Sequence, residues 1–369
     1  MLTPFDAIIG LWLMAGPAPG AAMASLAAPS APAAPKSVSA DTKPADAPAA
    51  LLELSDEELR ARIEEDSLSV GSLSIGTPSA ATLFNGVALQ ADPLWEIAPH
   101  ADTFGTSETL AAIRIAVDTV SELFSDTPPI VIGDISALKG GHLKRHQTHQ
   151  GGRDVDFGFY YKAGKGAWFV PGTAANMDLP RNWAFVRALV TRTDVETILL
   201  DTRIQRVLYQ YALGIGEARD WLDRVFQFSR GSSESIIRHV AGHRTHYHVR
   251  FYNPVAQELG RRAHPLLVEL NLMSPSVYTV SHVVQPGQTL GRLASQYRTP
   301  VRAIMQANGL RTAQLRVGHA YRIPMRGAPP PTTQPLVVRP RILPTTTPPT
   351  LATIDWPTVE SLYGSSQER

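Results

Sequence analysis

Proline-rich segments at both ends limit where this chain of 369 residues can build a hydrophobic core. Residues 27–50 (AAPSAPAAPKSVSADTKPADAPAA) and the runs PPPTTQP and PTTTPPT after residue 326 have no periodic apolar face. Proline lacks a backbone donor and fixes φ, so such segments favour extended, solvated chain. The sequence therefore predicts two globular stretches, residues 68–274 and 277–325, with a joint at residues 273–276.

The flanking segments are expected to serve export and tethering rather than chemistry. Residues 1–26 place a short apolar stretch before small residues, which is the pattern of a signal peptide. Residues 27–67 are predicted to be a Pro/Ala-rich linker and then a short acidic helix, which a capping box of Ser55 and Glu58 begins. Residues 326–369 are predicted to be a disordered Pro/Thr-rich tail.

Composition excludes several classes of function. The 34 Lys and Arg residues against 33 Asp and Glu give a net charge of +1, so the chain as a whole has no basic field for nucleic acid. Cysteine is absent, which excludes disulfides, thiolate metal sites and cysteine nucleophiles. No run of about 18 apolar residues occurs, so no transmembrane segment is expected. A metal ion in this chain must rely on His, Asp or Glu ligands.

Most of the histidines are concentrated in two short segments, GGHLKRHQTHQGGRDVDFGF and RHVAGHRTHYHVRFY. An even spread of the 11 histidines over the chain would place fewer than one in residues 142–149 and 239–248 together, so the clustering indicates a shared role. The histidines concerned are His142, His146 and His149 in the first segment and His239, His243, His246 and His248 in the second.

Alternation within both segments predicts two strands with one polar face each. His246 and His248 alternate with apolar residues in HYHVRF, and Asp154 and Asp156 do so in DVDFGF. Imidazole and carboxylate groups are zinc ligands, and three protein ligands leave a position open for water. With His149, which precedes a Gly-Gly turn, these residues have the composition of a metal-dependent hydrolase site.

The segments NGVAL, GTSETL, VIGDIS, GGHLKRHQTHQGGRDVDFGF and GHRTHYHVRF resemble the penicillin-insensitive murein endopeptidase (MepA) family. The resemblance covers about residues 69–265. This family belongs to the LAS zinc metallopeptidases, named for lysostaphin, D-Ala-D-Ala peptidases and the hedgehog N-terminal domain. It implies an antiparallel sheet with flanking helices, a Zn²⁺ cofactor, and cleavage of D-alanyl–meso-diaminopimelyl crosslinks of peptidoglycan in the periplasm.

The resemblance also implies roles for individual residues. Asp154 shares a strand face with Asp156 and is expected to accept a hydrogen bond from a ligand histidine. The implied zinc ligands are His149, Asp156 and His248, and the implied catalytic residues are His246, His243 and His146.

The remaining pattern of the larger stretch predicts an α+β fold. Apolar residues at helical spacing predict a core-facing helix at residues 107–124. A strand at 195–200 and helices at 203–213 and 219–228 are expected further on. Because strands and helices mix without regular βαβ repetition, α+β is the favoured class.

Residues 280–325 predict a small βααβ module. Thr289 is placed to cap a first helix, and Pro300 to begin a second. The motifs PGQTLGRLASQY, QANGL and VGHAYRIP resemble the LysM domain, which binds N-acetylglucosamine-containing glycans of peptidoglycan or chitin. The glycan contacts expected from this resemblance are Gly287, Gln288, Thr289, Leu290, Asn308, Gly309 and Leu310.

The charge of this module agrees with a polyanionic partner. Residues 277–326 contain seven arginines and no acidic residue. Nucleic acid is the alternative partner for such charge, but no base-stacking aromatic pattern accompanies it. The partner expected from the sequence is therefore peptidoglycan.

Both stretches point to one polymer, so the sequence predicts an exported zinc endopeptidase that a LysM domain holds on the wall. Two alternatives remain open at this stage. One is a D,D-carboxypeptidase of the same metallopeptidase class. The other is a non-catalytic wall-binding protein with a structural metal site.

Overall fold

The structure is a computed structural model, and it divides into two units, Met1–Pro44 and Ala45–Arg369. The signal peptide expected at 1–26 lies outside the described residues, as does most of the expected linker. The described residues are 48–143, 146–162, 164, 168–230, 234–274, 277–326 and 336–344.

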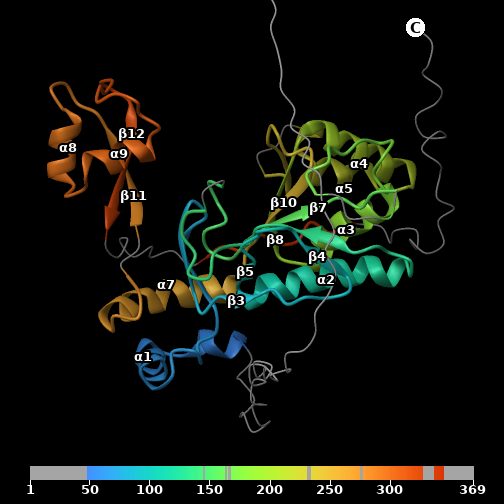
Figure 1. Cartoon of the computed structure of the whole chain (residues 1–369), viewed down its shortest axis with the longest axis horizontal. Helices are drawn as coiled ribbons and strands as arrows, with labels where there is room; N and C mark the ends of the chain where they lie inside the picture. Colours follow the sequence, from blue (N-terminus) through green and yellow to red (C-terminus); the bar gives the residue numbers. More distant parts are fainter. Residues whose placement is uncertain are drawn as a thin grey trace, which may run out of the picture. The chain divides into compact units, whose positions relative to one another are not determined.

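A six-stranded sheet forms the centre of the larger domain (Figure 1). Its inner pairs are antiparallel, as expected, but the two outer pairs, β4 with β6 and β8 with β9, are parallel. Parallel neighbours need a crossover, and helices between these strands provide it. In sheet order the strands are β4 (Trp95–Ile97), β6 (Ile130–Ile132), β7 (Asp154–Gly158), β10 (His246–Phe251), β8 (Val195–Leu200) and β9 (Ile237–His239).

The pairing of β7 with β10 places the polar residues of both strands on the same face of the sheet. His248 lies opposite Asp156, and Arg250 lies opposite Asp154. The intervening residues, among them Phe157 opposite Tyr247, point to the other face and are fully buried. Alternation therefore gives the sheet an apolar face for the core and a polar face at its middle two strands.

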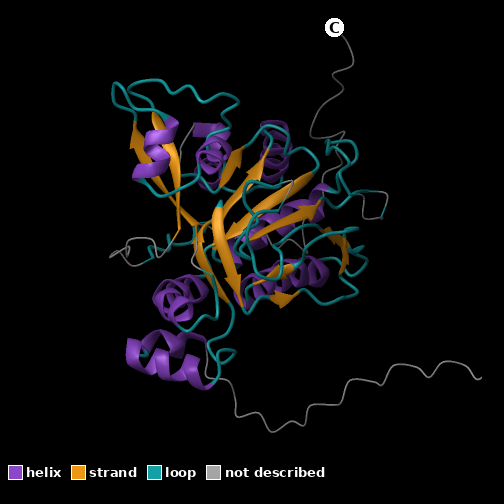
Figure 2. Ribbon diagram, turned by 60° about the vertical axis from the view of Figure 1, so that its left-hand side comes forward, coloured by secondary structure: helices purple, strands orange, loops and turns teal. Residues whose placement is uncertain are grey.

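Helices pack on the apolar face and form the α+β architecture that the sequence predicts (Figure 2). Thr106, Asp178 and Asp201 each accept a hydrogen bond from a backbone N–H in the first turn of the helix that follows, which fixes where that helix begins. Trp183 and Trp221 pack edge to face in this core. The helices are α2 (Ser107–Leu123), α3 (Leu179–Arg192), α4 (Thr202–Gly214), α5 (Arg219–Val225) and α6 (Gln227–Arg230).

A second apolar cluster joins the acidic helix to the end of the larger domain. The expected capping box is present: Ser55 accepts from the Glu58 backbone, and the Glu58 side chain accepts from the Ser55 N–H. Leu59 and Ile63 of this helix are buried, so the packed region extends ahead of residue 68. The elements here are η1 (Pro48–Glu53), α1 (Asp56–Glu65), β1 (Leu73–Thr77), β2 (Ala80–Phe84) and α7 (Pro254–Glu269), and a short pair, β3 (Val87–Ala88) with β5 (Phe104–Gly105), lies between them in sequence.

The C-terminal module has the expected βααβ order and its own small core. The Thr289 side chain caps the first helix by accepting from the Arg292 N–H. Pro300 is the N-cap of the second helix rather than its first residue, so this helix begins at Val301, one residue later than predicted. The elements are β11 (Val277–Val283), α8 (Leu290–Gln296), α9 (Val301–Ala307) and β12 (Ala320–Arg326).

Part of the expected disordered tail is packed. Residues 336–344, here called the C-terminal strap, run along the larger domain without forming a helix or strand. Trp221 Nε1 donates to the Ile342 carbonyl at 2.7 Å, and Arg341 pairs with Asp194 at 2.9 Å. The Ile342 side chain packs against the main core. A proline-rich segment cannot build a hydrophobic core alone, but one of its apolar residues can pack against the existing core of the larger domain.

Candidate metal centre

The polar face of the sheet brings together side chains from three places in the chain. Asp156 on β7 and His248 on β10 come from directly paired strand positions. His149 lies in the loop before β7, with φ at 64°, and Gly152 follows with φ at 69°. Glycine tolerates this left-handed backbone without strain, so the Gly-Gly turn lets the loop reverse beside the sheet. All three side chains are buried, and His149 is 0% exposed.

Three donor atoms form a nearly equilateral triangle. His149 Nε2 lies 3.0 Å from His248 Nδ1 and 3.2 Å from Asp156 Oδ1. His248 Nδ1 lies 3.1 Å from the same carboxylate oxygen. A tetrahedral zinc ion separates its nitrogen and oxygen ligands by about 3.3 Å. The triangle therefore has the dimensions of one face of such a site.

In both His149 and His248, the outer ring nitrogen, which is the one outside the triangle, has a hydrogen-bond acceptor. His149 Nδ1 lies 3.2 Å from the Ile135 carbonyl, and His248 Nε2 lies 2.9 Å from Asp154 Oδ1. Both acceptors require a proton on the nitrogen that faces them, so in the neutral rings the inner nitrogens carry lone pairs. Arg250 Nε also donates to Asp154, at 2.8 Å, which keeps this carboxylate ionised and in place. Two lone pairs and a carboxylate oxygen thus point at one spot.

The electrostatics of the centre favour a positive charge at that spot. Burial acts to raise the pKa of Asp156, but His149 and His248 outweigh it and hold the pKa well below its usual value. Burial acts to lower the pKa of His248, yet Asp154 and Asp156 raise it to about 9. Asp156 Oδ1 has no hydrogen-bond partner among the described residues although it is buried. The residues present therefore fit a bound cation, which would replace a proton on His248.

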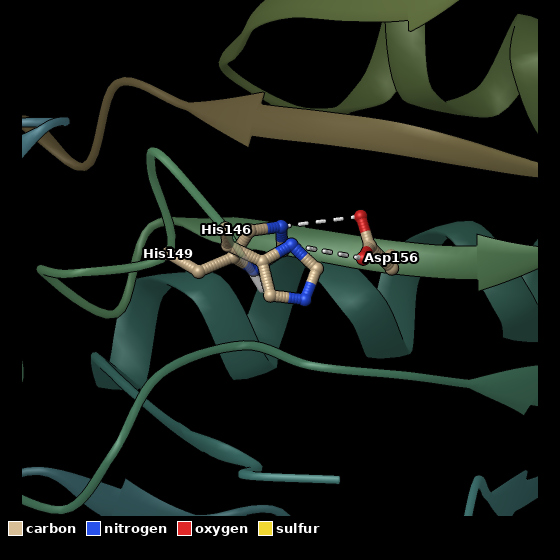
Figure 3. A group of neighbouring side chains, drawn as sticks. All are labelled: His146, His149 and Asp156. Atoms are coloured by element: carbon tan, nitrogen blue, oxygen red, sulfur yellow. Dashed lines mark ion pairs between the residues drawn. The ribbon is translucent and has the colours of Figure 1, made fainter. Parts of the chain in front are cut away.

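His146 is a further candidate ligand. Together with His149 and Asp156 it forms a group whose ligand atoms all lie within 4.8 Å of one another, and Figure 3 shows both rings directed at the Asp156 carboxylate. His146 Nε2 lies 2.8 Å from Asp134 Oδ2, and His146 Nδ1 lies 4.0 Å from Asp156 Oδ2. Since its outer nitrogen is held by Asp134, the inner nitrogen of His146 faces the centre as an acceptor.

His246 and His243 lie next to the other histidines of the centre. His246 Nε2 lies 3.7 Å from Asp156 Oδ1, and His246 Nδ1 lies 2.9 Å from the Thr245 hydroxyl. The His243 ring lies 5.2 Å from that of His246, centroid to centroid. Burial lowers the pKa of His243 and lowers that of His246 to about 4. Both rings are therefore neutral at neutral pH and can accept a proton.

The structure thus brings the expected site residues of the larger domain to one place, while their roles toward a metal stay predictions. Three parts of the centre escaped the sequence reading. The Ile135 carbonyl contacts His149 and the Thr245 hydroxyl contacts His246, and no sequence pattern predicts either contact. The rings of Phe169 and Trp168 lie beside His246, and no motif of the sequence indicates this.

The expected glycan contacts of the C-terminal module differ in how available they are. Leu290 is only 2% exposed and its side chain belongs to the core, so its contact with glycan stays a prediction that only its backbone could meet. Asn308 uses its side chain to hold β12, by donating to the Arg322 carbonyl and accepting from the Arg322 N–H. Gln288 accepts from the Gln285 N–H. The backbone turn at Gly287 and the exposed residues Thr289 and Gly309 leave polar groups at the surface, and Leu310 is half-buried.

Comparison with known proteins identifies the C-terminal module. Residues 282–324 match the LysM domain family, so the chain contains a LysM domain, which suggests binding to peptidoglycan and a cell-wall location. A search of curated proteins gives no match to the chain. The LysM match does not reach the metal centre, so the metallopeptidase resemblance of the larger domain stays a prediction. None of the described helices is both long and apolar enough to cross a membrane.

Proposed function

We propose that the chain is an exported zinc-dependent endopeptidase that hydrolyses D-alanyl–meso-diaminopimelyl crosslinks in peptidoglycan. The observation that carries this proposal is the convergence of His149 Nε2, Asp156 Oδ1 and His248 Nδ1 within 3.2 Å of one another in a buried site. A zinc ion held by these residues supplies Lewis acidity, which polarises a carbonyl group and lowers the pKa of water.

The surrounding histidines supply proton transfer. His246 is neutral because burial lowers its pKa to about 4, which leaves one ring nitrogen with a lone pair. In this proposal that nitrogen takes a proton from the attacking water and passes it to the leaving amine. Thr245 fixes the orientation of the His246 ring through its hydroxyl. His146, fixed by Asp134, presents its other nitrogen toward Asp156, 4.0 Å away, and the His243 ring lies 5.2 Å from the His246 ring.

The LysM domain contributes binding rather than chemistry. It is part of the same chain as the metal centre, so binding to a glycan strand raises the concentration of crosslinks near that centre. Residues 277–326, which include this domain, contain seven arginines and no acidic residue, and this charge favours an anionic polymer over a neutral one. Residues of both domains thus serve one substrate in this proposal.

A non-catalytic wall protein is the second candidate, and one observation favours it. His146 belongs to the group that can hold a metal ion. If His146 were a fourth ligand beside His149, Asp156 and His248, the site would be closed, as structural zinc sites are. The two candidates differ in what His146 does, because a catalytic site keeps its zinc when His146 is replaced.

Digestion of purified murein sacculi tests the proposal. The full chain is incubated with sacculi with and without a chelator, and new peptide termini are identified by mass spectrometry. The proposal predicts new D-alanyl carboxyl termini paired with new diaminopimelyl amino termini, and no product after chelation. Release of free D-alanine alone indicates a D,D-carboxypeptidase. Binding without any product favours the wall protein, and digestion that a chelator leaves unchanged contradicts the zinc mechanism.

A further inference from the structure

Two aromatic side chains flank the metal centre on the side of His246. The Phe169 ring lies 5.3 Å from the His246 ring, and the Trp168 ring lies 6.0 Å from it, centroid to centroid. The two aromatic rings pack edge to face at 4.9 Å. Phe169 is nevertheless 55% exposed, so most of its apolar surface faces solvent beside the proton-transfer residue. We call Trp168 and Phe169 the aromatic wall.

The surrounding structure holds the aromatic wall in place. Trp168 occupies the space above Gly133, where an added Cβ atom would lie 2.3 Å from the indole ring and 3.2 Å from the Asp156 Cβ. Any side chain at Gly133 would therefore displace Trp168 from its position next to the centre. On the C-terminal side, the Gly172 N–H donates to the Arg244 carbonyl at 2.8 Å, which ties this segment to the loop of His243.

The backbone of Phe169 is strained. Its φ of 60° lies in the left-handed region, which bulky side chains rarely adopt. Such strain persists where neighbouring contacts over-determine the conformation, and it concentrates at binding and catalytic sites. Core packing does not explain it here, because the ring is more than half exposed. Phe169 therefore keeps an exposed aromatic ring in a backbone conformation that a bulky residue disfavours.

We propose that Phe169, backed by Trp168, is a specificity-determining residue that contacts the alanyl methyl group next to the scissile bond. This inference rests on the proposed function. Thr245, His243 and Asp156, which also lie next to His246, are polar. A peptide that places its carbonyl at the metal centre therefore finds an apolar surface in the aromatic wall, and burying a polar substituent against that surface would cost free energy. The aromatic wall favours an apolar group such as a methyl.

Paired substrates test this contact. A sugar-free crosslinked peptide dimer is compared with the same dimer carrying glycine in place of the D-alanine at the scissile bond. The wild-type chain is expected to prefer the alanyl dimer about tenfold in kcat/KM, the discrimination that one methyl group gives in an apolar site. Phe169→Ala is expected to remove this preference mainly through KM, and Phe169→Leu to restore part of it. Leu68→Ala, which removes a 69% exposed apolar side chain elsewhere, is the control.

The outcomes separate this inference from the proposed function. Cleavage of both dimers with a preference that Phe169→Ala leaves unchanged overturns the contact while the endopeptidase stands. Equal loss of activity on both dimers in Phe169→Ala also overturns it, because the methyl group is then not what the ring touches. If the wild-type chain cleaves neither dimer, the endopeptidase fails. In that case the Kd of each dimer is measured by calorimetry. Tighter binding of the alanyl dimer supports the contact with Phe169, whereas equal binding of both dimers or no binding overturns it.

The strain gives an independent measurement. Phe169→Gly and Phe169→Ala remove the same ring, but only glycine accepts the left-handed backbone freely. We expect Phe169→Gly to unfold at a higher temperature than Phe169→Ala while both lose the alanyl preference. Equal unfolding temperatures would show that the ring is not held against its backbone preference, and would remove the strain argument for the contact.

Discussion

His149 and His248 stand 99 residues apart in the chain, yet their Nε2 and Nδ1 atoms lie 3.0 Å from each other. Each ring gives its outer proton to another acceptor, the Ile135 carbonyl for His149 and Asp154 for His248. Without a positive charge between them, the two inner lone pairs and Asp156 Oδ1 would repel one another.

Replacing Asp154 by Asn should weaken zinc binding while the three ligands remain. The carboxylate orients His248 and makes its inner nitrogen more basic, and loss of such a partner lowers metal affinity about 10- to 100-fold. Competition with a chromogenic chelator measures this affinity, and circular dichroism checks the fold. Asp92→Asn, which alters a surface ion pair with Arg114, serves as the control. Unchanged affinity in a folded Asp154→Asn chain would show that Asp154 does not act on His248.

Replacing His246 by Ala should preserve zinc and lose turnover. His246 is 3.7 Å from Asp156 Oδ1 and outside the ligand triangle, so its loss leaves the metal in place. Removal of a general acid–base group lowers turnover by about 10²- to 10⁴-fold. Zinc content and product release from sacculi are measured on the same sample, with the exposed His142→Ala as the control. Turnover equal to that of the wild type excludes His246 from proton transfer.

His264 should make stability depend on pH. This α7 side chain is 3% exposed, its Nε2 has no partner among the described residues, and burial lowers its pKa below the usual 6.5. As the pH falls below 6.5, the unfolded chain gains a proton that the folded chain does not, so the free energy of unfolding decreases. Urea unfolding between pH 7 and 5, compared with His264→Gln, isolates this contribution. An equal pH dependence in both chains contradicts it.

The C-terminal strap should loosen when the Ile342 side chain is shortened. Ile342 packs against the core, and its carbonyl accepts from Trp221, whereas Val337 in the same strap is 76% exposed. Ile342→Ala removes about 1 kcal/mol or more of apolar burial. Hydrogen exchange at residues 336–344 should therefore accelerate in Ile342→Ala and stay unchanged in Val337→Ala. The same exchange rate in both variants would mean that the side chain does not anchor the strap.

The sequence predicts the parts of this centre whose signals are local. Alternation in DVDFGF and HYHVRF predicts two polar strand faces, and the structure pairs these strands so that Asp156 meets His248. The helix at 107–124 and the βααβ module follow from periodicity and capping residues, and the structure confirms both.

Local sequence patterns cannot predict features that depend on packing between distant parts of the chain. The parallel outer strands follow from how the chain crosses the sheet, and the packed strap depends on a core that only the folded domain presents to Ile342. The same limit applies to Leu290, because the motif that suggests a glycan contact does not reveal that its side chain turns inward. Whether His146 or His248 is the third ligand is likewise a question of geometry, not of spacing.

X-ray absorption at the zinc edge tests the central claim most directly. The full chain is loaded with zinc and compared with His248→Ala and His146→Ala. We predict two imidazole nitrogens and a carboxylate oxygen around one zinc ion in the wild type, the same ligands in His146→Ala, and loss of an imidazole or of the ion itself in His248→Ala. Failure of the wild type to retain zinc, or an unchanged spectrum in His248→Ala, would contradict this assignment.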